Sequence, residues 1–193
     1  MSEAIASFFD KLSSGWDAHS HIDPKKVLSL LEKAAIREGD RVLDLGCGTG
    51  VLTPFLLSST HEEIVGLDVS SGMIEEAKKK YAGEKRVRFV NADFYSYEDE
   101  PFDLIVCFDA YPHFLDPKGF AKKARSLLKE GGHVAILHDC GRAALGHFHE
   151  GMDETLSREL KAPEEEIKPF LPYFDCILAE EDENHYLLLM AKK

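Results

Sequence analysis

Short, almost continuous runs of apolar residues alternate along this chain with longer segments in which apolar residues recur every three or four positions. The continuous runs predict buried strands, and the longer period predicts helices with one apolar face. Strands are expected at 42–45, 64–70, 87–94 (with its exit), 102–108 and 133–137, and helices at 3–13, 24–36, 51–57, 70–82 and 116–131. This alternation of strands and helices predicts an α/β fold built on a parallel sheet.

The pattern becomes weaker after residue 139. Helices are expected at 153–161 and 164–170, and strands at 174–179 and 185–191, with an acidic turn between the strands at 180–184. No internal repeat or linker interrupts the chain, so we expect a single domain over residues 1–193. Within it, residues 1–38 are expected to form a helical cap and residues 39–193 the nucleotide-binding core.

The first apolar run leads directly into glycines at alternate positions, from Val42 to Gly50. Glycine allows a positive φ and lets a ligand approach the backbone. A strand that enters such a turn before a helix is typical of nucleotide pockets, which lie beyond the carboxyl ends of parallel strands. The spacing is G-x-G-x-G rather than the dinucleotide G-x-G-x-x-G. Asp44 would repel a pyrophosphate, so the loop favours a ligand with a cationic or hydrogen-bond-donating end.

Composition narrows the range of partners. The chain carries 23 Lys plus Arg against 35 Asp plus Glu, a formal net charge of −12, which disfavours nucleic acid as a substrate. No apolar run approaches the length of a bilayer span, and the first residues lack a signal-peptide pattern. We therefore expect a cytoplasmic location without membrane insertion. The cysteines are scattered without a C-x-x-C pair and are interpreted as small apolar residues in a reducing compartment.

Residues 44–50, Asp-Leu-Gly-Cys-Gly-Thr-Gly, fit the E/D-x-G-x-G-x-G loop that binds S-adenosylmethionine (SAM) in class I methyltransferases. The run at 127–136 is similar to the L-K-P-G-G-x-L-x-I signature of the same family. Residues 108–114 resemble its fourth motif but lack the N/D-P-P-Y of nucleic-acid amino-methyltransferases. Residues 9–17 partly match the F-D-x-x-A-x-x-Y-D of quinone-biosynthesis members. The resemblance is specific over 40–140 and holds in outline elsewhere.

This resemblance implies a Rossmann-like doubly wound sheet of seven mostly parallel strands, with the last strand antiparallel and helices on both faces. It also implies SAM as the cofactor and S-adenosylhomocysteine as its product. Asp68 stands where a nucleotide fold places the carboxylate that binds the ribose hydroxyls. In the family, the positions of Asp93 and Phe94 contact adenine. The complete set of expected cofactor-binding residues is Asp44, Gly46, Cys47, Gly48, Asp68, Val69, Met73, Asp93, Phe94 and Phe108.

Candidate catalytic residues come from the loops expected at the carboxyl edge of the sheet. His138 and Asp139 follow the fifth strand, and His113 lies in the loop after the fourth. Each could act as a general base if the acceptor needs one, or could be a histidine or acid without a chemical role. The two H-x-H pairs, 19–21 and 147–149, raise the alternative of a zinc or iron site. Neither segment reads as a strand that would place both rings on one face, so no metal is expected.

The function expected from these features is methyl transfer from SAM to a small-molecule acceptor. A first alternative is a protein that keeps the SAM pocket without turnover. A second is an NAD-dependent oxidoreductase, against which Asp44 and the shorter glycine spacing argue. The segment up to about His21, with the apolar residues Phe8, Phe9 and Trp16, is expected to cover the pocket as a mobile lid.

Overall fold

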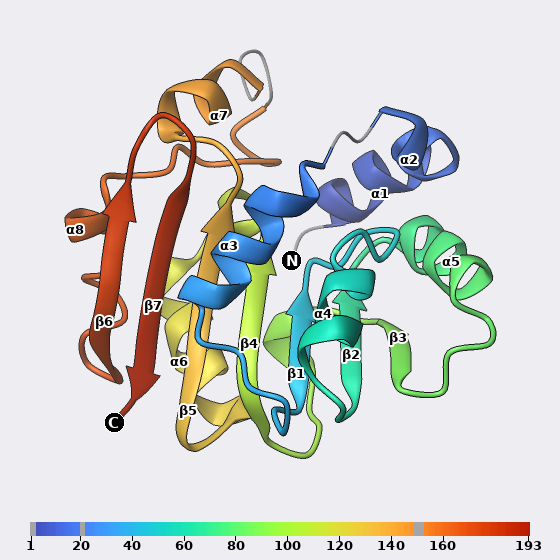
Figure 1. The fold of residues 1–193 in the computed structure, drawn as a ribbon. Coiled ribbons are helices and arrows are strands. Elements are labelled where there is room, and N and C mark those ends of the chain that lie inside the picture. The colour runs from blue at the N-terminus through green and yellow to red at the C-terminus, as the bar shows by residue number, and fades with distance from the viewer. Residues whose placement is uncertain (1–2, 20–21, 149–152) are drawn as a thin grey trace.

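The computed structural model describes residues 3–19, 22–148 and 153–193, apart from the side chains of 146–148. In this part of the chain, seven strands form one sheet in the order β3-β2-β1-β4-β5-β7-β6 (Figure 1). The strands are β1 (Val42–Leu45), β2 (Ile64–Asp68), β3 (Val87–Asn91), β4 (Phe102–Phe108), β5 (Leu128–His138), β6 (Phe174–Glu181) and β7 (Tyr186–Lys192). β1 to β5 run parallel, and β7 runs antiparallel to both of its neighbours, which confirms the predicted doubly wound sheet.

Helices cover both faces of the sheet. α3 (Pro24–Lys33) and α4 (Thr53–Ser59) pack on one face of β1 and β4, and α6 (Pro117–Leu127) packs on the opposite face. α5 (Ser71–Lys80) lies against β2 and β3. The central strands β1, β2 and β4 read as continuous apolar runs because they are buried on both sides, whereas the edge strands β3 and β6 are partly exposed.

The remaining short elements surround the carboxyl ends of the strands. They are α1 (Glu3–Leu12), η1 (Ser13–Gly15), α2 (Trp16–His19), η2 (Phe94–Ser96), η3 (Tyr111–His113), α7 (Arg142–Phe148) and α8 (Pro163–Glu166). Figure 1 shows α1 and α2 at the end of the sheet toward which β1, β2 and β4 point. Among the helices of the described residues, none combines the length and the apolar content needed to cross a bilayer.

The helix starts follow local capping chemistry. The Asp23 carboxylate accepts the N–H of Lys25 at 2.9 Å, with Pro24 in the first turn of α3. The Ser70 hydroxyl accepts the N–H of Met73 at 3.1 Å at the start of α5. Both caps satisfy N–H groups that have no partner within the helix, as the sequence predicts.

The prediction of a helix at 153–161 is wrong, because this segment forms a turn followed by extended chain. The Asp153 carboxylate accepts the N–H of Thr155 at 2.8 Å and holds the turn. Arg158 then donates its N–H to the carbonyl of Pro112 at 3.0 Å, and its guanidinium pairs with Glu166 at 2.8 Å. These contacts with distant residues draw the backbone across η3 and override the local helical period.

Candidate functional site

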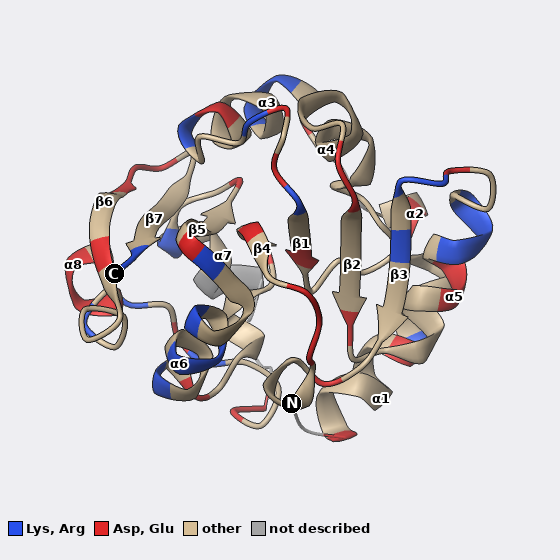
Figure 2. Ribbon diagram, turned by 90° about the horizontal axis from the view of Figure 1, so that it is seen from below, with Lys and Arg blue, Asp and Glu red and all other residues tan. Residues whose placement is uncertain are grey.

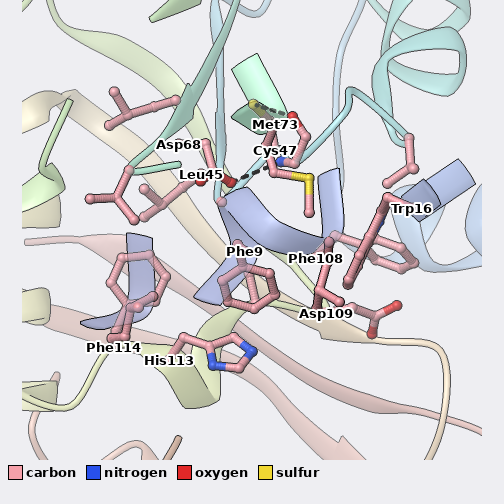
Figure 3. A pocket seen from close by; sticks show the side chains of 18 of the residues that line it. Phe9, Trp16, Leu45, Cys47, Asp68, Met73, Phe108, Asp109, His113 and Phe114 are labelled. Carbon is pink, nitrogen blue, oxygen red and sulfur yellow. Dashed lines mark hydrogen bonds between the residues drawn. The ribbon is translucent and has the colours of Figure 1, made fainter. Parts of the chain in front are cut away.

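A cavity of about 580 Å³ lies where β1, β2, β4 and β5 end (Figure 3). Its sheet side is built from residues 45–48, 67–69, 108–110 and 139–140, which end or follow these strands. Its other side is built from α1, α2 and Ile22. The cavity therefore occupies the place where doubly wound sheets bind their ligands.

Most of the residues expected to bind the cofactor line this cavity. They are Gly46, Cys47, Gly48, Asp68, Val69, Met73, Phe94 and Phe108. Asp93 does not: its carboxylate accepts the N–H of Tyr95 at 3.0 Å and caps η2, while Ala92 and Phe94 on either side reach the cavity. Asp44 does not line it either, although the next residue, Leu45, does.

All three glycines of the loop have positive φ, and Gly46 and Gly48 differ in what surrounds them. At Gly46, with φ +74°, an added Cβ would lie 2.6 Å from the Cβ of Ala110, so the protein itself fills that space. At Gly48, with φ +53°, an added Cβ would meet nothing within 4 Å. Because Gly48 also lines the cavity, the space beside it is free for a ligand.

Asp68, the last residue of β2, connects the glycine loop to α5. One carboxylate oxygen accepts the N–H of Gly48 at 2.9 Å, and the other accepts the N–H of Ser70 at 2.8 Å. Burial raises the pKa of Asp68 more than these bonds lower it. Each carboxylate oxygen has lone pairs for a further hydrogen bond, and Asp68 lines the cavity.

Asp44 is a buried carboxyl group with an incomplete set of partners. Its side chain is 2 % exposed, and its Oδ2 atom has no hydrogen-bond partner among the described residues. Burial, and next the charge of Asp68, raise the pKa of Asp44 to about 7. A buried acceptor without a partner is costly, so a donor or cation from a ligand fits this position. The ammonium group of SAM, the cofactor that the sequence resemblance implies, is such a donor.

The residues after β4 and β5 form a connected group, of which only a part was predicted from the sequence. Asp109 has φ +50°, which is unusual for a residue other than glycine. Its Oδ1 atom accepts the N–H of Asp139 at 3.1 Å and lies 3.3 Å from Nδ1 of His138. Asp109 and Asp139 both line the cavity. Burial, and next the charge of Asp109, raise the pKa of Asp139.

The prediction that His138 lies in a loop at the pocket is wrong. His138 is the last residue of β5 and is paired with Tyr186 of β7. The strand continues one residue further than its apolar run because β7 pairs with it there. The imidazole is fully buried, packs edge-on against the Tyr186 ring at 5.9 Å, and does not line the cavity. Its closest recorded contact with a residue that lines the cavity is the 3.3 Å approach of Nδ1 to Oδ1 of Asp109.

His113 lies in η3 and does line the cavity. Its Nδ1 atom is 2.8 Å from the carbonyl oxygen of Leu156. A carbonyl only accepts, so Nδ1 carries the proton of this hydrogen bond. The edge of the imidazole packs against the Phe9 ring at a centroid distance of 4.9 Å, which joins η3 to α1. Figure 3 shows Phe9 between His113 and the side of the pocket that carries Asp68.

Residues 3–19, which we name the N-terminal cover, are attached to the loops around the cavity by two acids. Asp10 accepts hydrogen bonds from the Ser70 hydroxyl at 2.6 Å and from the N–H of Gly72 at 2.8 Å. The Ser70 bond, followed by the Gly72 bond, lowers the pKa of Asp10.

Asp17 makes the second attachment. It accepts a hydrogen bond from the Thr49 hydroxyl at 2.5 Å and pairs with the Lys80 ammonium at 2.5 Å. In the sequence, Asp10 and Asp17 stand within the partial match at residues 9–17, which gives them no role by itself. The signal that could have found them is their position beside the apolar residues Phe9 and Trp16, both of which line the cavity.

The metal alternative gains no support from the described residues, in which no three His, Cys, Asp or Glu side chains lie close enough to hold an ion. His21, and the side chains of His147 and His149, fall outside the described residues. His19, the remaining member of the two pairs, has its Nδ1 atom 2.9 Å from the carbonyl oxygen of Gly15.

Residues 42–132 match the family model for the methyltransferase domain. The chain is 29% identical over 139 residues to the demethylmenaquinone methyltransferase of Clavibacter sepedonicus, covering 68% of this chain and 56% of that protein. It is 30% identical over 161 residues to the malonyl-[acyl-carrier protein] O-methyltransferase of Acetivibrio thermocellus, covering 81% and 56%. The chain thus spans little more than half the length of these relatives.

Solved structures share the fold at low sequence identity. The complex of DhpI with S-adenosylhomocysteine (SAH) superposes with a TM-score of 0.77 at 21% identity, over 98% of this chain and 96% of that chain. The N-methyltransferase NodS from Bradyrhizobium japonicum WM9, also with SAH, gives a TM-score of 0.73 at 15% identity, over 97% and 98%. At these identities the two structures support the fold alone.

Proposed function

Because this chain belongs to the class I SAM-dependent methyltransferases, whose cofactor is SAM, we propose that it transfers the methyl group of SAM to a small-molecule acceptor bound in the cavity of about 580 Å³. The observation that carries this proposal is Asp68. Asp68 is the last residue of β2. Its carboxylate accepts the N–H of Gly48, and both residues line the cavity where the glycine leaves space open.

Each part of the cofactor has a proposed partner. The Asp68 carboxylate, which lines the cavity, accepts the ribose hydroxyls. The unpaired oxygen of Asp44, next in the chain to the cavity-lining Leu45, is the proposed acceptor for the ammonium end. Met73 and Phe94, which line the cavity, contact adenine, and Asp93 accepts the adenine amino group from the adjoining η2 turn. Phe108 lies at the methionine end.

The chain's contribution to the chemistry is mainly positioning. SAM supplies a methyl group on a sulfonium, and transfer is an in-line displacement for which alignment of the two reactants lowers the barrier most. The N-terminal cover places Phe9 and Trp16 over the cavity and excludes water from it. His113 and Asp139 line the cavity and are the proposed proton acceptors. His138 does not line the cavity and contacts Asp109 instead, so it is not proposed as a proton acceptor.

Two alternatives are separated from this proposal by simple measurements. A protein that binds SAM without turnover would bind SAM and SAH and transfer no methyl group to any acceptor. An NAD-dependent oxidoreductase would bind NAD in preference to both. The buried, unpaired carboxylate of Asp44 beside the glycine loop opposes a pyrophosphate, so calorimetric titration should show SAM and SAH binding without NAD binding.

Asp68→Ala should weaken SAM binding by about 2–3 kcal/mol, or roughly 30- to 150-fold, because hydrogen bonds to a charged group contribute about 1.5–3 kcal/mol each. Isothermal titration calorimetry measures the change. Asp103→Ala is the matched control, since this carboxylate also accepts a backbone N–H, that of Arg41 at 2.9 Å, but does not line the cavity. Equal SAM affinity in the two variants would remove Asp68 from the ribose role.

SAM affinity should fall as the pH decreases through about 7. The raised pKa of Asp44 means that its carboxyl group is protonated below that pH in the free protein, and an ammonium ligand needs it ionised. The affinity should then decrease by up to about tenfold for each pH unit. Titrations in buffers with different ionisation enthalpies should detect proton release on binding at pH values below about 7.

Asp44→Asn provides the control for that dependence. The free energy of unfolding of the unliganded wild type should decrease as the pH rises from about 4, the usual carboxyl pKa, to about 7, because the folded state holds the proton more tightly over that interval. The Asn variant should lack both this slope and the pH dependence of SAM binding. A variant that keeps the full pH dependence of binding would assign it to another group.

A further inference from the structure

We propose that the acceptor is an amine, an apolar molecule with a basic nitrogen that binds between Asp109 and Asp139. This inference rests on the proposed methyl transfer and adds the chemical class of the acceptor. Both acids line the cavity beyond the ends of β4 and β5, on the far side of the glycine loop from the Asp68 position.

The charge of the cavity wall has one sign. Asp68, Asp109 and Asp139 line the cavity, and no Lys or Arg is among its described lining residues. The Lys26 ammonium approaches from outside and donates to the main-chain carbonyl of Asp139 at 2.8 Å, without lining the cavity. Acidic residues also mark the arrow ends of β1 and β2 in Figure 2. An anionic acceptor would be repelled here, and a cationic one attracted.

The two carboxylates keep oxygens available for a ligand. Oδ1 of Asp109 takes both the N–H of Asp139 and the contact with His138, and Oδ2 has no hydrogen bond in the described residues. The Asp139 carboxylate makes no hydrogen bond in the same part of the chain, although the residue is half-buried. Charged oxygens that lie in a cavity without donors are suited to an ammonium, which carries only donors.

The buried imidazole of His138 is an independent observation that points to the same place. Neither ring nitrogen has a hydrogen-bond partner within the described residues, and the side chain is fully buried directly behind Asp109. Nδ1 lies 3.3 Å from Oδ1 of Asp109. His138 thus contacts Asp109 at Oδ1 alone and leaves Oδ2 for a ligand.

The rest of the acceptor side is apolar and aromatic. Its lining includes Phe8, Phe9, Leu12, Trp16, Phe114 and Leu145. Aromatic rings also attract ammonium groups that lie over their faces. An acceptor that fits this wall combines an apolar body with one basic nitrogen.

The transfer step balances with the residues present. An ammonium acceptor first gives one proton to the Asp139 carboxylate, whose raised pKa suits it as the base. The nitrogen lone pair then forms the N–CH₃ bond, and the electron pair of the breaking S–CH₃ bond goes to sulfur. The product is the methylated ammonium together with SAH, and the carboxyl proton returns to solvent.

Calorimetry on the full chain saturated with SAH tests this inference with three probes that share one apolar body. These are 2-phenylethylamine, 2-phenylethanol and 3-phenylpropanoate. The amine should bind about 10-fold or more tightly than the alcohol, as expected for a charge-assisted bond, and the carboxylate should bind most weakly. SAH binding is measured first, so its failure would overturn the proposed function, whereas SAH binding without an amine preference would overturn only this inference.

Variants assign the preference to the two acids. Asp109→Asn and Asp139→Asn should each abolish the amine preference while SAH affinity stays unchanged. Asparagine tolerates positive φ, so the backbone at 109 is preserved. Asp175 is an exposed acid on β6, and Asp175→Asn, the matched control, should keep the amine preference. Asp139→Lys should favour the carboxylate probe. An amine preference that persists in both Asn variants would contradict the inference.

Discussion

Gly48→Val is expected to abolish SAM binding and leave the domain folded. The residue lines the cavity, and an added Cβ points into space where no protein atom lies within 4 Å. A valine side chain would therefore occupy the volume that the cofactor needs. Its β-branched side chain also resists the φ of +53°, at a cost on the order of 1–3 kcal/mol, which a domain of this size can tolerate.

Gly131→Val is a matched control for the backbone strain. Gly131 has φ +75° and, like Gly48, nothing within 4 Å of an added Cβ, but it lies in the irregular part of β5 between Leu128 and His133 and does not line the cavity. Circular dichroism and thermal unfolding should show similar destabilisation in the two variants. Calorimetry should show SAM binding only in Gly131→Val, and wild-type affinity in Gly48→Val would mean that the loop is not the cofactor site.

Deleting residues 1–21 should leave a folded domain that binds SAM more weakly and no longer transfers the methyl group. The N-terminal cover supplies Phe9 and Trp16 to the cavity, and its attachments are made by Asp10 and Asp17 to the edges of the glycine loop and α5. Within α1 only Ile5 is buried, so the sheet loses little of its core. Turnover should fall by about 100-fold or more, because misplacing the acceptor by about 1 Å already costs that much.

The full-length variant Phe9→Ala serves as the companion to the deletion. It removes the ring that contacts His113 and leaves both acidic attachments in place, so turnover should fall while thermal stability changes less than in the deletion. Methyl transfer to the phenylethylamine probe and thermal unfolding are measured in parallel. Unfolding of the truncated chain, or full turnover by it, would show that residues 1–21 are part of the core rather than a lid.

The sheet was predictable because its signals are local. The central parallel strands β1, β2 and β4 are buried on both faces and appear as apolar runs, and the glycine loop combines unusual backbone conformations with a fixed spacing. The position of Asp68 at the end of β2 followed from the same reasoning. Whatever depends only on the period of apolar residues and on turn chemistry can be derived from one sequence.

The parts that were missed depend on contacts between distant segments. His138 lies in β5 rather than in a loop because β7 extends the pairing to Tyr186, about 50 residues later in the chain. Asp109 was not considered, although it follows β4 much as Asp68 ends β2, so the same rule applied to the fourth strand would have found it. Its left-handed backbone and its bond with Asp139 are tertiary features without a sequence signal.

The attachments of the N-terminal cover also determine when the pocket forms during folding. Asp10 and Asp17 bind residues that lie 32 or more positions later, in the turns after β1 and β2 and in α5. Those turns acquire their shape only after the parallel strands have paired, which is slow because the contacts are far apart in sequence. We therefore expect the cover to dock last and open first, so that a partly folded chain holds a complete sheet before it holds an enclosed cavity.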